Sequence, residues 1–240
     1  MPTTSHSRIR FATTNWTLVG KLKGPDGAAA LAALCEQYWF PLYAFVRRRL
    51  GNDHDARDST QAFFAWLLER NLLRRAAEDR GRLRSFLLTS LQNFLHNEYQ
   101  AGRRQVRGGD RLHESLDFDE ASSKFAALPA DNMTAERLYE RSWVLLLLER
   151  VLCRLQDDMD AAGQGQRFRL LKQTLCGEQT DGYAEMAVKL GTSEAAARQA
   201  ASRLRTRYRQ LLLEEVQATV ADPADVDDEI HRLFVALAPA

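Results

Sequence analysis

Apolar residues recur every three or four positions along most of this chain, and this spacing constrains the fold more than any other feature. Such spacing places apolar side chains on one face of an α-helix, whereas a half-buried strand alternates at every second position. No stretch alternates convincingly at that shorter period, so the sequence predicts an all-α fold without a sheet. Three predicted helix faces consist of Leu31, Leu34, Tyr38, Leu42, Phe45 and Val46; of Thr60, Phe63, Phe64, Leu67 and Leu68; and of Leu87, Leu88, Leu91, Phe94 and Leu95.

The helical spacing is interrupted between residues 102 and 134. This stretch contains Gly108, Gly109, Pro129 and scattered acids, a composition typical of a linker that can include a short helical piece. A chain of 240 residues is long enough for two small domains. The sequence therefore predicts a helical domain over 28–104, a flexible linker over 105–133, a second helical domain over 134–217 and an acidic helical tail over 218–240.

Several features predict a cytoplasmic protein with no membrane segment. The most apolar run, Trp143–Leu148, is far too short to cross a bilayer, and we expect a buried helix there. The first eleven residues are polar and basic, without the apolar stretch of a signal peptide. The cysteines Cys35, Cys153 and Cys176 are widely spaced, which fits a reducing compartment.

The sequence predicts no enzyme, no cofactor and no metal. No glycine-rich segment matches a phosphate-binding loop or a dinucleotide fingerprint. The histidines are isolated and lack the spacing of metal ligands; they are His6, His54, His96, His113 and His231.

The distribution of charge is more informative than its sum, which is +1. Arginines are dense in residues 70–84, 103–111 and 198–209. Local basic patches of this kind bind phosphates even when the net charge is near zero.

The segment Tyr183–Tyr208 predicts a helix-turn-helix. One short helix ends at Gly191, where a positive φ costs little, and Ser193 is a favourable N-cap for the next. The first helix has an apolar face of Tyr183, Met186, Ala187 and Leu190, and the second buries Ala197, Ala201, Leu204 and Tyr208. A basic second helix in this motif lies in the major groove of DNA.

Side-chain chemistry divides the outer face of that second helix into two groups. Gln199, Ser202 and Arg203 have groups that reach base edges, because arginine pairs with guanine and glutamine with adenine. The flanking arginines Arg198, Arg205 and Arg207 suit phosphates. The alternative is a pair of packed helices with a solvated arginine face.

Two further polar helix faces are candidates for binding. On 82–104, the stripe opposite the apolar face carries Thr89, Asn93, His96, Asn97, Gln100 and Arg104. Amides can bind the edges of unstacked bases, and arginines hold the backbone. On 53–70, Asp58 and Gln61 point away from the apolar face and could bind a protein partner. Ordinary solvated surface is the alternative for both.

Taken in order, these segments resemble the extracytoplasmic-function sigma factors of bacterial RNA polymerase, over roughly residues 28–215. Asp55–Phe63 is similar to the family pattern D-A-E-D-x-x-Q-E-x-F, although Arg57 and Ala62 replace acids. Residues 84–104 resemble the helix that melts and reads the −10 element, and residues 183–212 resemble the region that reads the −35 element. The flanking stretch Thr13–Val19 and the acidic tail resemble a planctomycete-type branch.

The resemblance implies roles for residues at matching positions. It implies docking of the clamp helices of the largest polymerase subunit, binding of promoter DNA, an anti-sigma factor as a further partner, a base-capturing loop within 71–82 and an acidic linker in the polymerase channel. The implied polymerase contacts are Asp55, Asp58 and Gln61; the −10 contacts are Arg84, Asn93, Asn97, Gln100, Arg103 and Arg104; the −35 contacts are Thr192, Arg198, Gln199, Ser202, Arg203 and Arg205; and the linker acids are Glu114, Asp117, Asp119 and Glu120.

Two other classes of protein remain open. A stand-alone helix-turn-helix regulator would bind a duplex palindrome as a dimer without polymerase. A helical adaptor or anti-regulator would bind only protein and would ignore DNA.

Overall fold

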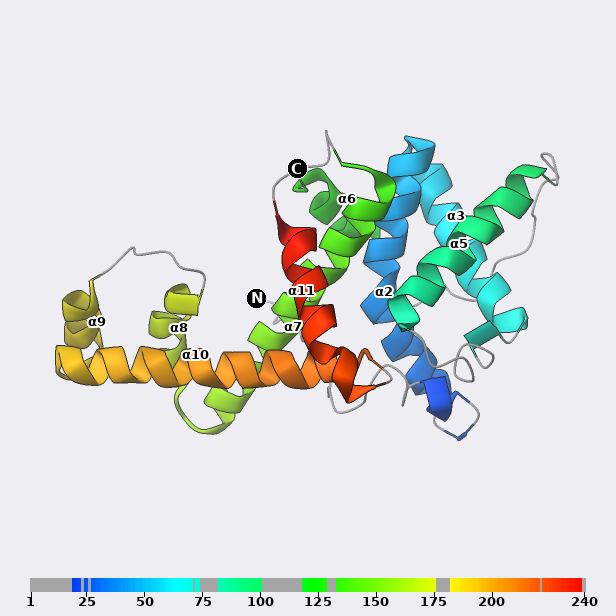
Figure 1. Ribbon diagram of the computed structural model, residues 1–240. Helices are drawn as coiled ribbons and strands as arrows, with labels where there is room; N and C mark the ends of the chain where they lie inside the picture. The colour runs from blue at the N-terminus through cyan, green and yellow to red at the C-terminus, as the bar shows by residue number, and fades with distance from the viewer. Residues whose placement is uncertain are drawn as a thin grey trace, which may run out of the picture.

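The computed structural model describes residues 19–22, 24–25, 27–70, 72–73, 82–100, 118–128, 133–175, 182–220 and 222–238. Within these residues all regular structure is helical and no strand occurs, which confirms the all-α fold class (Figure 1). The main elements are α2 (Gly27–Leu50), α3 (Asp53–Glu69), α5 (Leu83–Gln100), α6 (Phe118–Ala126), α7 (Ala135–Ala161), α8 (Gly165–Leu171), η1 (Lys172–Leu175), α9 (Tyr183–Leu190), α10 (Glu194–Gln217), η2 (Pro223–Asp225) and α11 (Val226–Leu237).

Side-chain caps determine where several helices begin. The side chain of Asn52 accepts the N–H of Asp55 at 2.8 Å and starts α3. Thr134 Oγ1 accepts the N–H of Arg137 at 3.2 Å and starts α7. Each cap satisfies a backbone donor that has no partner within the first turn of its helix.

The larger of two hydrophobic cores is rich in aromatic residues. It lies between α2, α3 and α5, and it includes the first half of α7 and residues of α11. Phe63 is completely buried, and its ring centroid lies 5.8 Å from that of Phe94 on α5 and 6.0 Å from that of Trp66. The predicted faces of α3 and α5 are confirmed, because Thr60, Phe63, Phe64, Leu67, Leu87, Leu91 and Phe94 are all buried.

The smaller core is built mostly from aliphatic and small residues. It brings the second half of α7 together with α8, α9 and α10. Phe168 is its one fully buried aromatic residue among those described, and four of its eleven buried residues are alanines. These buried alanines are Ala187, Ala197, Ala200 and Ala201.

Two long helices contribute to both cores. Along α7, Trp143 and Leu147 belong to the larger core and Val151 and Leu155 to the smaller one. The 24-residue helix α10 likewise contributes Val216 to the larger core, and Figure 1 shows it running from α9 to the start of α11. The division into domains at residue 133 therefore stays a prediction.

The helical spacing of Leu138, Ser142, Leu145, Leu152 and Leu155 predicts a single buried face on α7, and this prediction is partly wrong. Leu138, Ser142 and Leu155 are buried as expected, but Leu145 is 39% exposed. Trp143 takes its place in the core. The reason is that α7 packs on α2 with its first half and on α8 and α10 with its second half, so the buried face shifts along the helix.

Part of the predicted linker is a packed helix. The helix α6 contacts α2, and the ring of its Phe125 meets that of Tyr43 edge-on at 6.2 Å. Arg48 Nε also donates to the carbonyl of Met133 at 3.0 Å. Residues 118–128 thus have a fixed place beside α2, where the sequence predicted a flexible segment with at most a short helical piece.

None of the helices that the structure describes combines the length and apolarity needed to cross a membrane. The same residues contain no cluster of three histidine, cysteine or acidic side chains suited to a metal ion.

Candidate nucleic-acid interface

The turn between α9 and α10 has the geometry that the sequence predicts. Gly191 is left-handed, with φ 63° and ψ 37°, and the N–H of Thr192 donates to the carbonyl of Ala187 at 2.9 Å. Ser193 is extended, and its Oγ accepts the N–H of Ala196 at 3.2 Å. Glycine tolerates the left-handed conformation that ends one helix, and serine caps the next, so the local sequence sets the angle between the two helices.

Buried apolar side chains hold the two helices together. Met186 and Ala187 are buried on α9, and Ala201 and Leu204 are buried on α10. Tyr208 is half-buried against the same cluster. The predicted packing faces of both helices are therefore confirmed.

The opposite face of α10 presents polar side chains to solvent. Gln199, Ser202 and Arg203 are all exposed. Among the described residues their side chains have no hydrogen bond or ion pair. Thr192, at the turn, is also exposed. These groups can therefore bind an external ligand without first breaking an internal contact.

Two predicted phosphate contacts flank this face and share a neighbour. Arg198 donates from Nη2 to Glu194 Oε1 at 2.6 Å, and its guanidinium lies 5.0 Å from the ring centroid of Tyr183. Arg205 Nη1 donates to the Tyr183 hydroxyl at 3.3 Å. Exposed ion pairs within a helix contribute only about 0.3–0.5 kcal/mol, so a phosphate can replace Glu194 as the partner of Arg198.

Arg207 has a different place from the other arginines of α10. Its Nη2 lies 2.8 Å from Asp158 Oδ2 on α7, and the residue is half-buried. This pair connects α10 to the end of α7. The structure therefore gives Arg207 an internal partner, as it does Arg198, and a phosphate contact by Arg207 stays a prediction.

The polar face of α5 is open along most of its length. Thr89, Asn93, His96 and Asn97 are exposed. Asn93 and Asn97 lie one turn apart and present their amides on the same side. Gln100 ends this helix, but its side chain is outside the described residues, as are Arg103 and Arg104 altogether.

Arg84 is a predicted −10 contact that the structure does not leave available. Only 3% of this residue is exposed. Its guanidinium pairs with Glu140 of α7, lies 5.0 Å from the ring centroid of Trp143 and, through Nε, 2.8 Å from Oε1 of Glu229 on α11. The prediction is corrected: in this arrangement Arg84 is an internal ion-pair partner, because carboxylates from distant parts of the sequence reach it.

The predicted polymerase contacts lie on one end of α3. Asp55 and Asp58 are exposed, and Gln61 is half-buried. Asp55 accepts a hydrogen bond from Asn52 Nδ2 at 2.7 Å, and Asp58 lies 3.7 Å from His54 Nε2. The start of α3 therefore presents two carboxylates to solvent.

A polar cluster beside these residues was missed by the sequence analysis. Arg57, at an acidic position of the family pattern, pairs with Asp53 at 2.8 Å and donates to Ser122 Oγ of α6 at 2.8 Å. The Tyr43 hydroxyl also donates to Asp53. Partial burial raises the pKa of Asp53, but hydrogen bonds from Tyr43, Arg57 and Ser122 outweigh burial and hold that pKa below its ordinary value. The spacing of Asp53 and Arg57 was the only sequence signal of this cluster.

The predicted channel-lining acids cannot be placed. Glu114 and Asp117 lie outside the described residues, and the side chains of Asp119 and Glu120 do as well, although both residues belong to α6.

Comparisons with protein-family models, with curated proteins and with solved structures found no match to this chain. Its resemblance to sigma factors therefore stays a prediction. Any functional assignment depends on the exposed faces of α3, α5 and α10.

Proposed function

We propose that this chain is a sigma factor of the small extracytoplasmic-function kind, which binds core RNA polymerase and directs it to promoters through −35 and −10 elements. The main support for this proposal comes from α10. The helix pair α9–α10 presents Gln199, Ser202 and Arg203 as exposed polar groups on the outer face of its second helix. Helix-turn-helix proteins read base edges in the major groove with such side chains.

The polar face of α5 supports a second contact with DNA. The exposed amides of Asn93 and Asn97 can hydrogen-bond to the edges of unstacked bases. In this proposal, two helical domains joined by a linker bind the −35 and −10 elements at a fixed spacing. Once one domain is bound, the linker raises the effective concentration of the other domain at its own element.

The acidic start of α3 supports binding to a protein partner. Asp55 and Asp58 are exposed there, with Gln61 beside them. In this proposal the surface docks the clamp helices of the polymerase, and an anti-sigma factor is a further partner. The protein itself performs no catalysis and acts in the cytoplasm.

In vitro transcription with purified core polymerase on a promoter library tests the proposal. The complete chain should program defined start sites. Arg203→Ala should weaken initiation by about 1–3 kcal/mol at one base position of the −35 element, because a bidentate contact is lost. Arg209→Ala removes the same charge from an exposed position six residues further along α10, on another side of the helix, and should have no base-specific effect. Failure of the complete chain to program any start site would contradict the proposal.

Binding to polymerase is tested by charge reversal. Asp58→Arg should reduce recovery of core polymerase in a pull-down with the complete chain. Glu69→Arg makes the same change at the other, exposed end of α3 and should leave recovery unchanged. Equal recovery with both variants would remove Asp58 from the docking surface.

A stand-alone helix-turn-helix regulator is the second candidate. Phe234 and Val235 of α11 are 68% and 56% exposed, and adjacent exposed apolar residues favour an interface between two copies. Such a regulator binds duplex DNA tightly as a dimer without polymerase. A gel shift with free protein distinguishes the two functions, since the proposed sigma factor binds duplex promoters poorly alone.

A further inference from the structure

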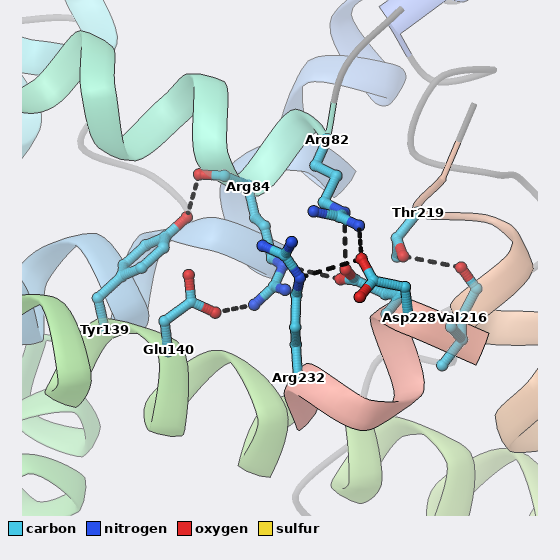
Figure 2. Close-up of polar contacts among 9 residues, drawn as sticks. Arg82, Arg84, Tyr139, Glu140, Val216, Thr219, Asp228 and Arg232 are labelled. Atoms are coloured by element: carbon cyan, nitrogen blue, oxygen red, sulfur yellow. Dashed lines mark hydrogen bonds and ion pairs between the residues drawn. The ribbon is translucent and has the colours of Figure 1, made fainter. Parts of the chain in front are cut away.

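Carboxylates of helix α11 pair with Arg82 and Arg84, which lie at the start of α5. Asp228 Oδ2 accepts a hydrogen bond from Arg82 Nη2 at 2.5 Å, and Glu229 Oε2 lies 3.0 Å from Arg82 Nε. The other oxygen of Glu229 lies 2.8 Å from Arg84 Nε. Figure 2 shows Arg82 and Arg84 reaching from the start of α5 toward α11 and α7. We call Asp228 and Glu229 the carboxylate pair.

Burial makes this contact unusual. Glu229 is completely buried, and Arg84 is almost so. Removing charged groups from water is costly, and the pairing offsets this cost only when the geometry is good. Here both oxygens of Glu229 lack a hydrogen-bond partner of proper geometry among the described residues, although guanidinium nitrogens are close. Apolar residues at such sites often stabilise a protein as well or better, so stability alone does not explain the contact.

The charges of the cluster balance only while α11 is in place. Arg82, Arg84 and Arg232 face Glu140 and the carboxylate pair. Without the three residues of α11, two arginines would remain against Glu140 alone. The hydrogen bond from Arg82 holds the pKa of exposed Asp228 below its ordinary value, so this carboxylate is charged at neutral pH.

Guanidinium groups bind carboxylates and phosphates with the same planar, bidentate geometry. Arg82 directly precedes α5, whose exposed face is the proposed contact with opened DNA. A nucleic-acid phosphate would therefore compete with the carboxylate pair for the same arginine.

We infer that α11 is an internal latch, in which the carboxylate pair occupies Arg82 and Arg84 until a single-stranded nucleic-acid backbone displaces it. This inference rests on the proposed function, because it concerns regulation of the same DNA-binding face. In the latched state Arg84 is buried and Arg82 is paired with Asp228 and Glu229. Release of α11 frees Arg82 for at least one phosphate contact.

Binding of a short fluorescein-labelled single-stranded oligonucleotide to the free, complete chain tests the latch. The double substitution Asp228→Asn with Glu229→Gln should tighten binding roughly fivefold to tenfold at about 50 mM salt for each phosphate that a released arginine binds. The slope of log affinity against log salt should steepen by about 0.7 for each such phosphate. The matched control is Asp225→Asn with Asp227→Asn, which removes two exposed charges that have no ion pair among the described residues. Adding Arg82→Gln to the Asp228→Asn, Glu229→Gln latch variant should return the affinity to that of the unmodified chain.

Equal affinities and equal salt slopes for the latch variant and the Asp225→Asn, Asp227→Asn control would overturn the latch. Hydrogen exchange on the unmodified chain decides the question even if the latch variant fails to fold. Saturating oligonucleotide should speed exchange in residues 226–237, and unchanged or slower exchange there would contradict displacement. None of these measurements uses polymerase. A latch without promoter-directed initiation would refute only the proposed function, whereas initiation without any effect of α11 would refute only the latch.

Discussion

The two hydrophobic cores are built on different principles. The larger core contains most of the fully buried aromatic residues, among them Tyr38, Phe63 and Trp143. The smaller core holds α9 and α10 together through aliphatic side chains such as Met186 and Leu204 and through several buried alanines. Aromatic side chains bury a large area each, whereas alanines bury little but let helices approach closely. Close helix packing and the turn at Gly191 therefore help to fix the part of the molecule that presents the exposed α10 face.

The largest expected effect is in the larger core. Phe63→Ala should lower the free energy of unfolding by about 3–5 kcal/mol, because it leaves a cavity beside Phe94 and Trp66. Urea denaturation followed by far-ultraviolet circular dichroism measures the loss. Phe234→Ala removes the same ring from an exposed position and should cost far less. Similar losses for the two variants would show that burial of aromatic side chains does not stabilise the larger core.

The smaller core should be sensitive to added volume. Ala201→Leu should lower the free energy of unfolding by about 1–3 kcal/mol, because the completely buried alanine has no room for three more carbons. The same denaturation experiment measures this change. Ala195→Leu, on the exposed side of α10, should change stability by less than about 0.5 kcal/mol. A neutral Ala201→Leu variant would mean that close approach of the helices does not hold this core.

A change in the turn between α9 and α10 should have the next largest effect on the free energy of unfolding. Gly191→Ala places a Cβ on a left-handed residue and should cost about 1–2 kcal/mol, although nothing lies within 4 Å of the added carbon. The loss is therefore one of backbone conformation and not of space. Gly191→Asn should lose less in thermal and urea unfolding, since asparagine tolerates this conformation. An equal loss of stability with alanine and with asparagine would show that the positive φ of residue 191 is not the cause.

The smallest effect concerns the brace between α7 and α10. A double-mutant cycle of Arg207→Ala and Asp158→Ala should give a coupling energy of about 0.2–1 kcal/mol, because both side chains are partly exposed. The coupling should shrink at high salt. A coupling energy of several kcal/mol would show that the smaller core depends on charge more than on packing.

Local features of the molecule were predictable from sequence. The apolar spacing located the buried faces of α3 and α5, and the pairing of Gly191 with Ser193 located the turn before α10. Both signals act over a single helical turn, so neighbouring residues contain them completely.

Long-range features were not predictable in the same way. Arg84 looked like an accessible cation because its carboxylate partner Glu229 lies far away in the sequence. Leu145 looked buried because its spacing fits a straight, single-sided helix, whereas α7 changes neighbours along its length. The docking of α6 depends on Ser122, Asp53 and Tyr43 meeting from three segments, and no local pattern encodes such a meeting.

Three of the four tryptophans, Trp39, Trp66 and Trp143, pack in or against the larger core, and among the described residues the smaller core has none. The emission of these three tryptophans, excited at long wavelength, will therefore follow one half of the molecule. Opening of α9 or the turn would leave that emission largely unaltered. An observer who relied on this signal alone would report an intact protein while its α10 surface was already disordered, so an extrinsic label near α9 is needed to see both halves.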